Sequence, residues 1–176
     1  MLNRQLARHG FTLTEIMVVV LVLGVVASVA ISSLRASNST NVDAAAKLLA
    51  SQISFARDRA SGRGQWHYVV IEPGFGEVGI FTKPTAAFVP VQEPYSPDPL
   101  RVRFGPESRF AGVALNEFNI NGQPVLAFDE NGTPHSVTAS GTGPVELRND
   151  SFFILGSSSG TVRVTVTPIV AHVRVE

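Results

Sequence analysis

Cysteine is absent from this chain of 176 residues, and neither sign of charge is in excess. Without cysteine there is no disulfide framework, no thiolate metal site and no cysteine nucleophile. The chain has 14 basic and 14 acidic residues and a formal net charge of zero, so bulk electrostatics gives no indication of a nucleic-acid partner. Composition alone therefore indicates neither a cofactor nor a catalytic class.

Charge is almost missing from residues 11–34, where Glu15 is the single ionisable side chain. A helix of that length spans roughly 36 Å at about 1.5 Å per residue, enough to cross a hydrocarbon core of about 30 Å. The preceding residues 1–10 carry Arg4 and Arg8 without an acid. The positive-inside rule then predicts a cytoplasmic N-terminus and a domain on the other side of the membrane.

Two ordinary interpretations fit this hydropathy profile. One is a secretory signal peptide cut at a small-residue site such as Ser28-Val29-Ala30, and the other is a plain single-span anchor. Neither accounts for Glu15, because an acidic side chain at mid-helix costs roughly 2.5 to 3.5 kcal/mol on insertion and less near an end. An intramembrane carboxylate therefore indicates a functional partner.

The stretch Gly10-Phe11-Thr12-Leu13-Thr14-Glu15, followed by a Val/Leu-rich run, resembles the N-terminal signal of type IV prepilins and type II secretion pseudopilins. The resemblance implies that a prepilin peptidase cuts after Gly10 and methylates the new N-terminal Phe11. It also implies that Glu15 pairs with the N-terminal amine of a neighbouring subunit in a filament. One departure is Ser32, which occupies a position where many family members have a helix-bending proline.

An amphipathic helix is predicted over residues 35–61. Residues that cap or interrupt helices predict a break or bend between Ala36 and Asn41, with Asp43 available to cap a new turn. The segment's Ala56-Arg57 pair and Gly-rich exit resemble the GspH/FimT family, and Gly62 and Gly64 fit a helix stop. One apolar face recurs at spacings of three and four, at Val42, Ala46, Leu49, Ile53, Ala56 and Ala60.

Residues 62–176 show short β-branched and aromatic runs separated by turn residues, the pattern of antiparallel sheet. Asn121-Gly122 and Asn131-Gly132 are tight-turn signals. The proline-rich stretch 83–99 is expected to be a loop, and the FDENG turn at 128–132 again resembles GspH/FimT members. The expected strands are 66–72, 77–82, 100–104, 113–120, 125–129, 136–139, 152–155, 161–167 and 169–175.

Two enzyme motifs occur in this region without the context they need. The G-x-G-x-x-G of residues 74–79 precedes a strand pattern, whereas a dinucleotide fingerprint opens a helix. The G-x-S-x-G of residues 156–160 precedes an alternating strand and is expected to be a hairpin loop. His9, His67, His135 and His172 lack metal-ligand spacing, and Asp129-Glu130 lacks a calcium-loop pattern.

These features predict an α+β, type IV pilin-like fold: a long N-terminal helix, with a membrane half and an amphipathic half, packed on a small antiparallel two-sheet β domain. The expected parts are a leader (1–10), a membrane and filament-core helix (11–34), an amphipathic helix (35–61) and a periplasmic β domain (62–176).

The resemblance implies a structural subunit, not an enzyme, of a type II secretion pseudopilus, with a minor type IV pilin for pilus assembly or DNA uptake as the alternative. Its implied partners are prepilin peptidase, other pseudopilins or pilins, and inner-membrane lipid before assembly. No metal or other cofactor is expected. Nucleic-acid binding is expected to be weak, with Arg163 and Arg174 as a local basic spot. DNA-binding relatives carry Gly-Arg-x-Arg, and Thr161 stands here at the first arginine.

Overall fold

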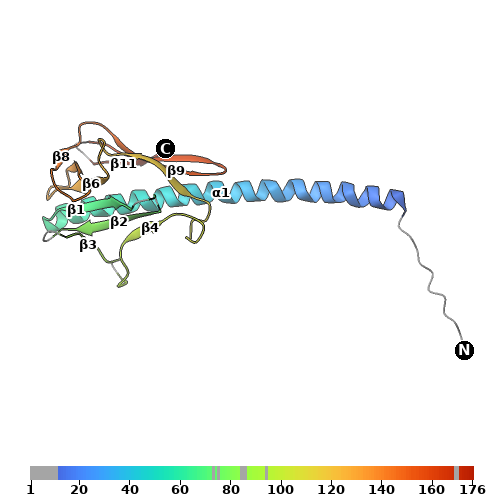
Figure 1. Ribbon diagram of the computed structural model, residues 1–176, viewed down its shortest axis with the longest axis horizontal. Coiled ribbons are helices and arrows are strands. Elements are labelled where there is room, and N and C mark those ends of the chain that lie inside the picture. The colour runs from blue at the N-terminus through green and yellow to red at the C-terminus, as the bar shows by residue number, and fades with distance from the viewer. Residues whose placement is uncertain (1–11, 73, 75, 84–86, 94, 169–170) are drawn as a thin grey trace, which may run out of the picture. The chain divides into compact units, whose positions relative to one another are not determined.

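The computed structural model describes residues 12–72, 74, 76–83, 87–93, 95–168 and 171–176, with the side chains of 29–39 excepted. The chain divides into two units, Met1–Ala36 and Ser37–Glu176. Helix α1 (Leu13–Arg63) contributes to both units, and all of the strands belong to the second (Figure 1).

The predicted break between Ala36 and Asn41 is wrong, because α1 is helical through these residues. Asp43 accordingly lies inside the helix and caps nothing. Serine and asparagine cost an established helix only about 0.5 kcal/mol each relative to alanine. The backbone hydrogen bonds that continuation of the helix adds outweigh this small cost.

The end of α1 is determined by glycine at the position after the last helical residue. Gly64 follows Arg63 with φ of 59°, a left-handed conformation that glycine adopts without a Cβ penalty. The Gln65 backbone N–H then donates to the Ala60 carbonyl at 3.1 Å, the six-to-one bond of a Schellman motif. Of the two predicted stop residues, Gly64 therefore ends the helix and Gly62 lies within it.

The apolar face predicted for the second half of α1 is confirmed. Each of its members is completely buried, and Ala45 joins them, so the face combines small and large side chains. Alanines let the backbone approach a sheet closely, while Leu49 and Ile53 fill the space between layers. Truncating either of these to alanine would cost about 2 to 5 kcal/mol.

The first of two antiparallel sheets has seven strands. Its strand order is β3-β2-β1-β6-β7-β8, and β4 pairs with the same edge of β2 as β3. The strands are β1 (His67–Ile71), β2 (Glu77–Thr82), β3 (Val89–Pro90), β4 (Arg101–Arg103), β6 (Val125–Phe128), β7 (Pro134–Val137) and β8 (Val145–Glu146).

A second, four-stranded sheet has the order β11-β10-β9-β5, all antiparallel. Its strands are β5 (Ala114–Asn119), β9 (Ser151–Ser157), β10 (Gly160–Val166) and β11 (Val173–Val175). The register of β5 on β9 shifts between Leu115 and Glu117, which marks a β-bulge at an edge strand.

Each expected strand overlaps an observed one, and β2 has the predicted bounds. Strands β3 and β8, at the edges of the sheet, were not predicted. Each has two residues, which is too short to show a period of two. The predicted Asn121-Gly122 turn is confirmed, with φ of 53° and 75° at the two residues and a bridge from Ile120 to Gln123.

One hydrophobic core joins the helix to both sheets. Val42 to Ala60 on α1, Val69 and Leu126 from the first sheet, and Phe153 and Val164 from the second belong to the same buried cluster. In Figure 1 this half of α1 lies along the strands. The predicted α+β fold with a helix packed on two antiparallel sheets is therefore confirmed.

Candidate assembly site

The predicted processing junction, Gly10-Phe11, lies outside the described residues. The first described residue is Thr12, which directly follows the junction. Thr12 precedes the first helical residue, Leu13, and its Oγ1 accepts a hydrogen bond from the Glu15 backbone N–H at 3.3 Å. Thr12 is therefore the N-cap of α1, and Glu15 is at the third helical position.

This position supplies Glu15 with part of its compensation inside its own chain. A carboxylate in the first turn interacts favourably with the positive end of the helix dipole, typically by 0.3 to 1 kcal/mol. Thr-x-x-Glu before an apolar run is the capping-box signature, and it could have been found in the sequence. The prediction that only another subunit compensates Glu15 overlooked Thr12.

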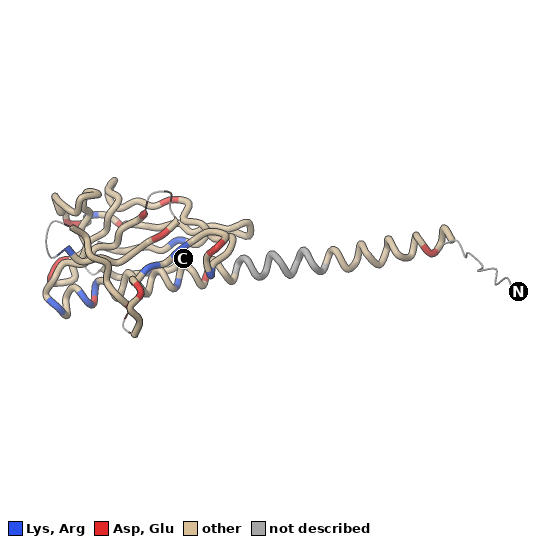
Figure 2. Tube along the Cα trace, turned by 60° about the horizontal axis from the view of Figure 1, so that its bottom comes forward, with Lys and Arg blue, Asp and Glu red and all other residues tan. Residues whose placement is uncertain are grey.

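The described residues of the first unit carry many exposed apolar side chains. Figure 2 shows a single acidic segment and no basic one along the described residues of this stretch. No helix within the described residues is both long and apolar enough to cross a membrane. The predicted span, 11–34, lies partly outside those residues. Exposed large apolar side chains here are Leu13, Ile16, Met17, Val18, Val19, Val20, Leu21, Val22, Leu23, Val25 and Val26.

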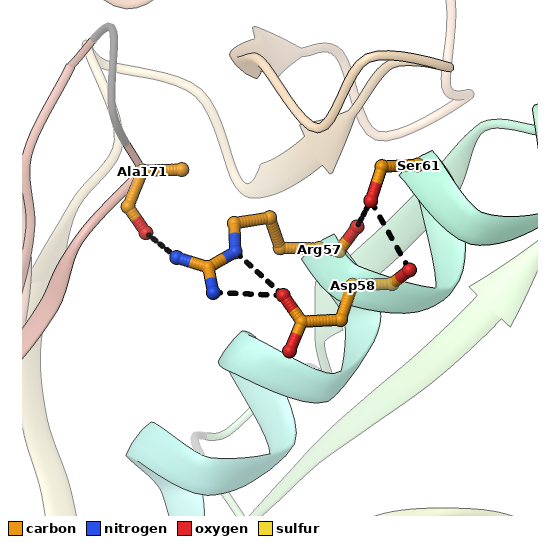
Figure 3. A network of polar contacts seen from close by, with 4 residues as sticks. All are labelled: Arg57, Asp58, Ser61 and Ala171. Carbon is orange, nitrogen blue, oxygen red and sulfur yellow. Dashed lines mark hydrogen bonds and ion pairs between the residues drawn. The ribbon is translucent and has the colours of Figure 1, made fainter.

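In the second unit, Arg57 on α1 lies against two other parts of the chain, one of which, at Ala171, is drawn in Figure 3. Its Nη1 donates to the carbonyl oxygen of Ala171 at 3.0 Å, while Nε and Nη2 donate to Oδ1 of Asp58 at 2.9 and 2.7 Å. Ala171 is buried and has φ of 47°, so its carbonyl is held in an unusual backbone conformation. The guanidinium therefore ties α1 to the segment before β11.

The other part is the turn between β6 and β7. A Cβ built at Gly132 would lie 3.3 Å from Cγ of Arg57 and 3.6 Å from Cβ of Ser61, and φ there is 81°. Asp129 shapes the turn, since its Oδ1 accepts hydrogen bonds from the backbone N–H groups of Asn131 and Thr133. The FDENG stretch is thus a close-packed turn against the helix, which the sequence resemblance did not specify.

His67 is completely buried at the start of β1. Its Nδ1 lies 2.9 Å from the carbonyl oxygen of Gln65, so that nitrogen carries the proton, and Nε2 is a buried acceptor with no partner among the described residues. Burial lowers the pKa of His67, the Gln65 carbonyl opposes this, and the charges of Arg59 and Arg63 on α1 lower it further. The side chain is therefore a neutral core residue.

A charged cluster lies at the outer edge of β2. Glu77 accepts hydrogen bonds from Arg101 Nη1 at 2.9 Å and from Arg103 Nε at 2.8 Å. Partial burial acts to raise the pKa of Glu77, but the hydrogen bonds and charges of the two arginines outweigh it and hold the pKa below its usual value. Pairing of β4 with β2 creates this cluster, which sequence spacing alone does not reveal.

The two arginines expected to form a basic spot both have local partners. Arg163 on β10 stacks its guanidinium 4.0 Å from the ring centre of Phe152, and Arg174 on β11 forms a 2.6 Å ion pair with Glu176. Arg163 also exchanges backbone hydrogen bonds with Glu176. The Arg163 side chain therefore lies on an aromatic ring and the Arg174 side chain beside an acid.

The two enzyme motifs have the geometry of turns and strands. Glu77 to Gly79 of the G-x-G-x-x-G stretch belong to β2, and residues 156–160 form the hairpin between β9 and β10. No group of three or more potential metal ligands occurs in the part of the chain that the structure describes.

Two comparisons with known proteins match this arrangement. Residues 6–31 match the prokaryotic N-terminal methylation motif. Among solved structures, the chain is similar to the minor pseudopilin EpsH from the Type 2 Secretion System of Vibrio cholerae, with a TM-score of 0.55 and 12% identity, covering 77% of this chain and 96% of EpsH. Among curated proteins, none matches.

The type IV minor pilin FimU of Pseudomonas aeruginosa also appears, with a TM-score of 0.47 and 16% identity over 78% of this chain and 88% of FimU. The chain therefore combines a pilin-like fold with an N-terminal methylation motif. The particular resemblance predicted from the sequence, to minor pseudopilins and minor pilins of the GspH/FimT type, is confirmed by the motif together with the EpsH-like fold.

Proposed function

We propose that this chain is a structural minor pseudopilin of a type II secretion system. Prepilin peptidase cuts after Gly10 and methylates Phe11, residues 11–34 hold the chain in the inner membrane, and the β domain lies in the periplasm. The chain then joins other pseudopilins in a short filament. One observation carries this proposal: a methylation motif precedes a domain whose fold covers 96% of a minor pseudopilin.

The exposed apolar side chains of the first unit support the proposal physically. Burying each of these side chains completely contributes about 1.5 to 3 kcal/mol of favourable free energy. This surface would therefore be covered by membrane lipid before assembly and by neighbouring subunits in the filament. Transfer of the helix from lipid to the filament changes the hydrophobic free energy little. Charge pairs can therefore determine the register between neighbouring subunits. Cleavage after Gly10 creates a cation on Phe11 that a neighbour's Glu15 can neutralise in low dielectric.

Deleting the gene and complementing it tests the proposal. The deletion is expected to abolish secretion of the organism's type II exoproteins while leaving surface motility and DNA uptake intact, and the wild-type chain should restore secretion. Loss of motility or DNA uptake with normal secretion would instead favour a minor type IV pilin. A Gly10→Phe variant, which keeps the domain but blocks cleavage, is the matched control and should not restore secretion.

A further inference from the structure

A short projecting segment leaves the first sheet between β3 and β4. We call residues 91–93 and 95–100 the arm. Its two roots meet at Ile80 of β2: the Val91 N–H donates to the Ile80 carbonyl at 2.9 Å, and the Ile80 N–H donates to the Leu100 carbonyl at 3.0 Å. The Leu100 N–H closes the junction on the Val91 carbonyl at 2.7 Å. Val91 and Leu100 are both buried, so the arm is anchored in the core.

Hydrogen bonds continue from the roots toward the tip. Gln92 and Pro99 form an antiparallel bridge, and the Glu93 N–H donates to the Asp98 carbonyl at 2.9 Å. Near the tip, Ser96 Oγ donates to Oδ2 of Asp98 at 2.7 Å. Among its described residues the arm is therefore a hydrogen-bonded hairpin, and these bonds hold it before any partner arrives.

The tip presents an aromatic side chain with no protein around it. Tyr95 is 103% exposed, compared with 44% for Val89 and 52% for Val145, the other exposed large apolar side chains described in the β domain. Tyrosine supplies a large amphipathic contact area at a low entropic cost, and it is enriched among the residues that dominate binding energy. A pre-shaped hairpin further lowers the cost of binding.

The arm carries charge of one sign. Between Pro84 and Leu100 the ionisable side chains are Glu93, Tyr95 and Asp98, so both charges at neutral pH are acidic. Both acidic residues are exposed. A complementary surface would combine an apolar socket for the tyrosine ring with a rim of lysine or arginine.

We propose that the arm is a docking element whose Tyr95 inserts into such a socket on a different pilin-like subunit, adjacent to this chain in the filament. The proposal rests on the proposed function and adds the contact that fixes the position of this chain among its neighbours. The anchored roots transmit the contact directly to β2 and the core.

A second copy of this chain fits the arm poorly. A pocket of about 470 Å³ that combines arginines with an apolar wall is lined by Arg101, Arg109 and Phe110, and its lining also includes the chain's own Glu93 and Asp98. A second pocket with arginines and an aromatic ring, lined by Arg101, Arg103 and Phe104, likewise contains acidic residues, Glu72, Glu77 and Glu107. The acidic tip of another copy would meet like charges there. Arg101 is in addition already paired with Glu77. Charge complementarity therefore favours a different subunit.

Site-specific photo-crosslinking of the full chain in cells tests the proposal. Benzoylphenylalanine is placed separately at Tyr95, at the exposed control position Val145 on β8, and at Val18 in the first unit as a reporter of assembly. Crosslinks are identified with antibodies to each co-encoded pilin-like subunit and to this chain. Tyr95→Ala and Tyr95→Phe variants are compared for recovery of the crosslinked subunit with the assembled filament, and Val145→Ala is the matched control.

The expected result is a crosslink from position 95, and not from 145, to one different pilin-like subunit. Co-recovery of that subunit should fall about ten-fold or more in Tyr95→Ala and less in Tyr95→Phe. Crosslinks from position 18 without a crosslink from 95, or a crosslink from 95 to a second copy, would overturn the inference and leave the proposed function standing. Absence of crosslinks at both positions would overturn both.

Discussion

Arg57 on α1 donates a hydrogen bond of 3.0 Å to the carbonyl of Ala171, a residue 114 positions later in the chain. Ala171 is buried and has φ of 47°, and the guanidinium supplies a hydrogen-bond donor to its carbonyl. It joins the helix to a residue just before β11, the last strand of the chain.

Replacing Arg57 by alanine is expected to destabilise the fold by about 1 to 3 kcal/mol, because the Ala171 carbonyl loses its partner. Urea unfolding of the full chain in detergent measures the loss, and amide exchange should accelerate between Thr167 and Val175. Asp58→Ala is the matched control. It removes an exposed ion pair and should cost less than about 1 kcal/mol. Equal losses of unfolding free energy in the two variants would show that the ion pair with Asp58, and not the hydrogen bond to Ala171, stabilises the fold.

Gly64 and Gly62 give opposite expectations for the same substitution. Gly64→Ala places a Cβ at φ of 59° and should destabilise by about 1 to 2 kcal/mol. Gly62→Ala lies in the helix with no atom within 4 Å of the new Cβ, so it should stabilise by about 0.5 to 1 kcal/mol. Thermal unfolding of both variants checks the signs, and a gain in Gly64→Ala would rule out the Schellman ending.

His67 gives the β domain a pH dependence. Its pKa in the folded state lies below its usual value because of burial and the nearby Arg59 and Arg63, so the unfolded chain binds a proton first as the pH falls. Its contribution to stability is present above the unfolded pKa of about 6.5 and is lost as the pH falls toward the folded pKa.

Unfolding free energies measured in detergent at several pH values between 7.5 and 5.5 should fall less steeply in His67→Phe than in the wild-type chain. The exposed His172 provides the control, and His172→Asn is expected to keep the wild-type slope. If His67→Phe kept that slope as well, the buried neutral histidine would not be the source of the pH dependence.

Glu15 has two possible roles that variants can separate. If its main role is the charge pair between subunits, Glu15→Gln should abolish incorporation into the filament, since the neutral side chain leaves the neighbour's amine unpaired. Thr12→Ala removes the N-cap, should cost α1 about 1 kcal/mol, and should leave incorporation near normal. Crosslinking from Val18 in both variants provides the measurement. Similar incorporation of both would mean that Glu15 serves mainly its own helix.

Much of the fold follows from local patterns in the sequence. The apolar spacing from Val42 to Ala60 defines the buried helix face, and Asn121-Gly122 defines a turn, because each depends only on neighbouring residues. The expected break near Ser37 failed because local capping side chains were weighed without the hydrogen bonds of the helix on either side. The Thr12 cap was equally local and was overlooked.

Other features could not be predicted because they depend on distant partners. The Arg57 to Ala171 bond and the pairing of Glu77 with Arg101 appear only when the sheets are assembled. The arm was expected to be a plain loop, since proline-rich composition gives no sign of the Val91 and Leu100 bonds to Ile80.

The intact mass of the chain extracted from membranes tests the central claim most directly. The account predicts loss of residues 1–10 and addition of one methyl group to the new N-terminal Phe11, with both changes absent in a strain lacking prepilin peptidase. A chain cut after Ala30 and released as a soluble domain, or one that keeps residues 1–10 in the presence of the peptidase, would contradict it.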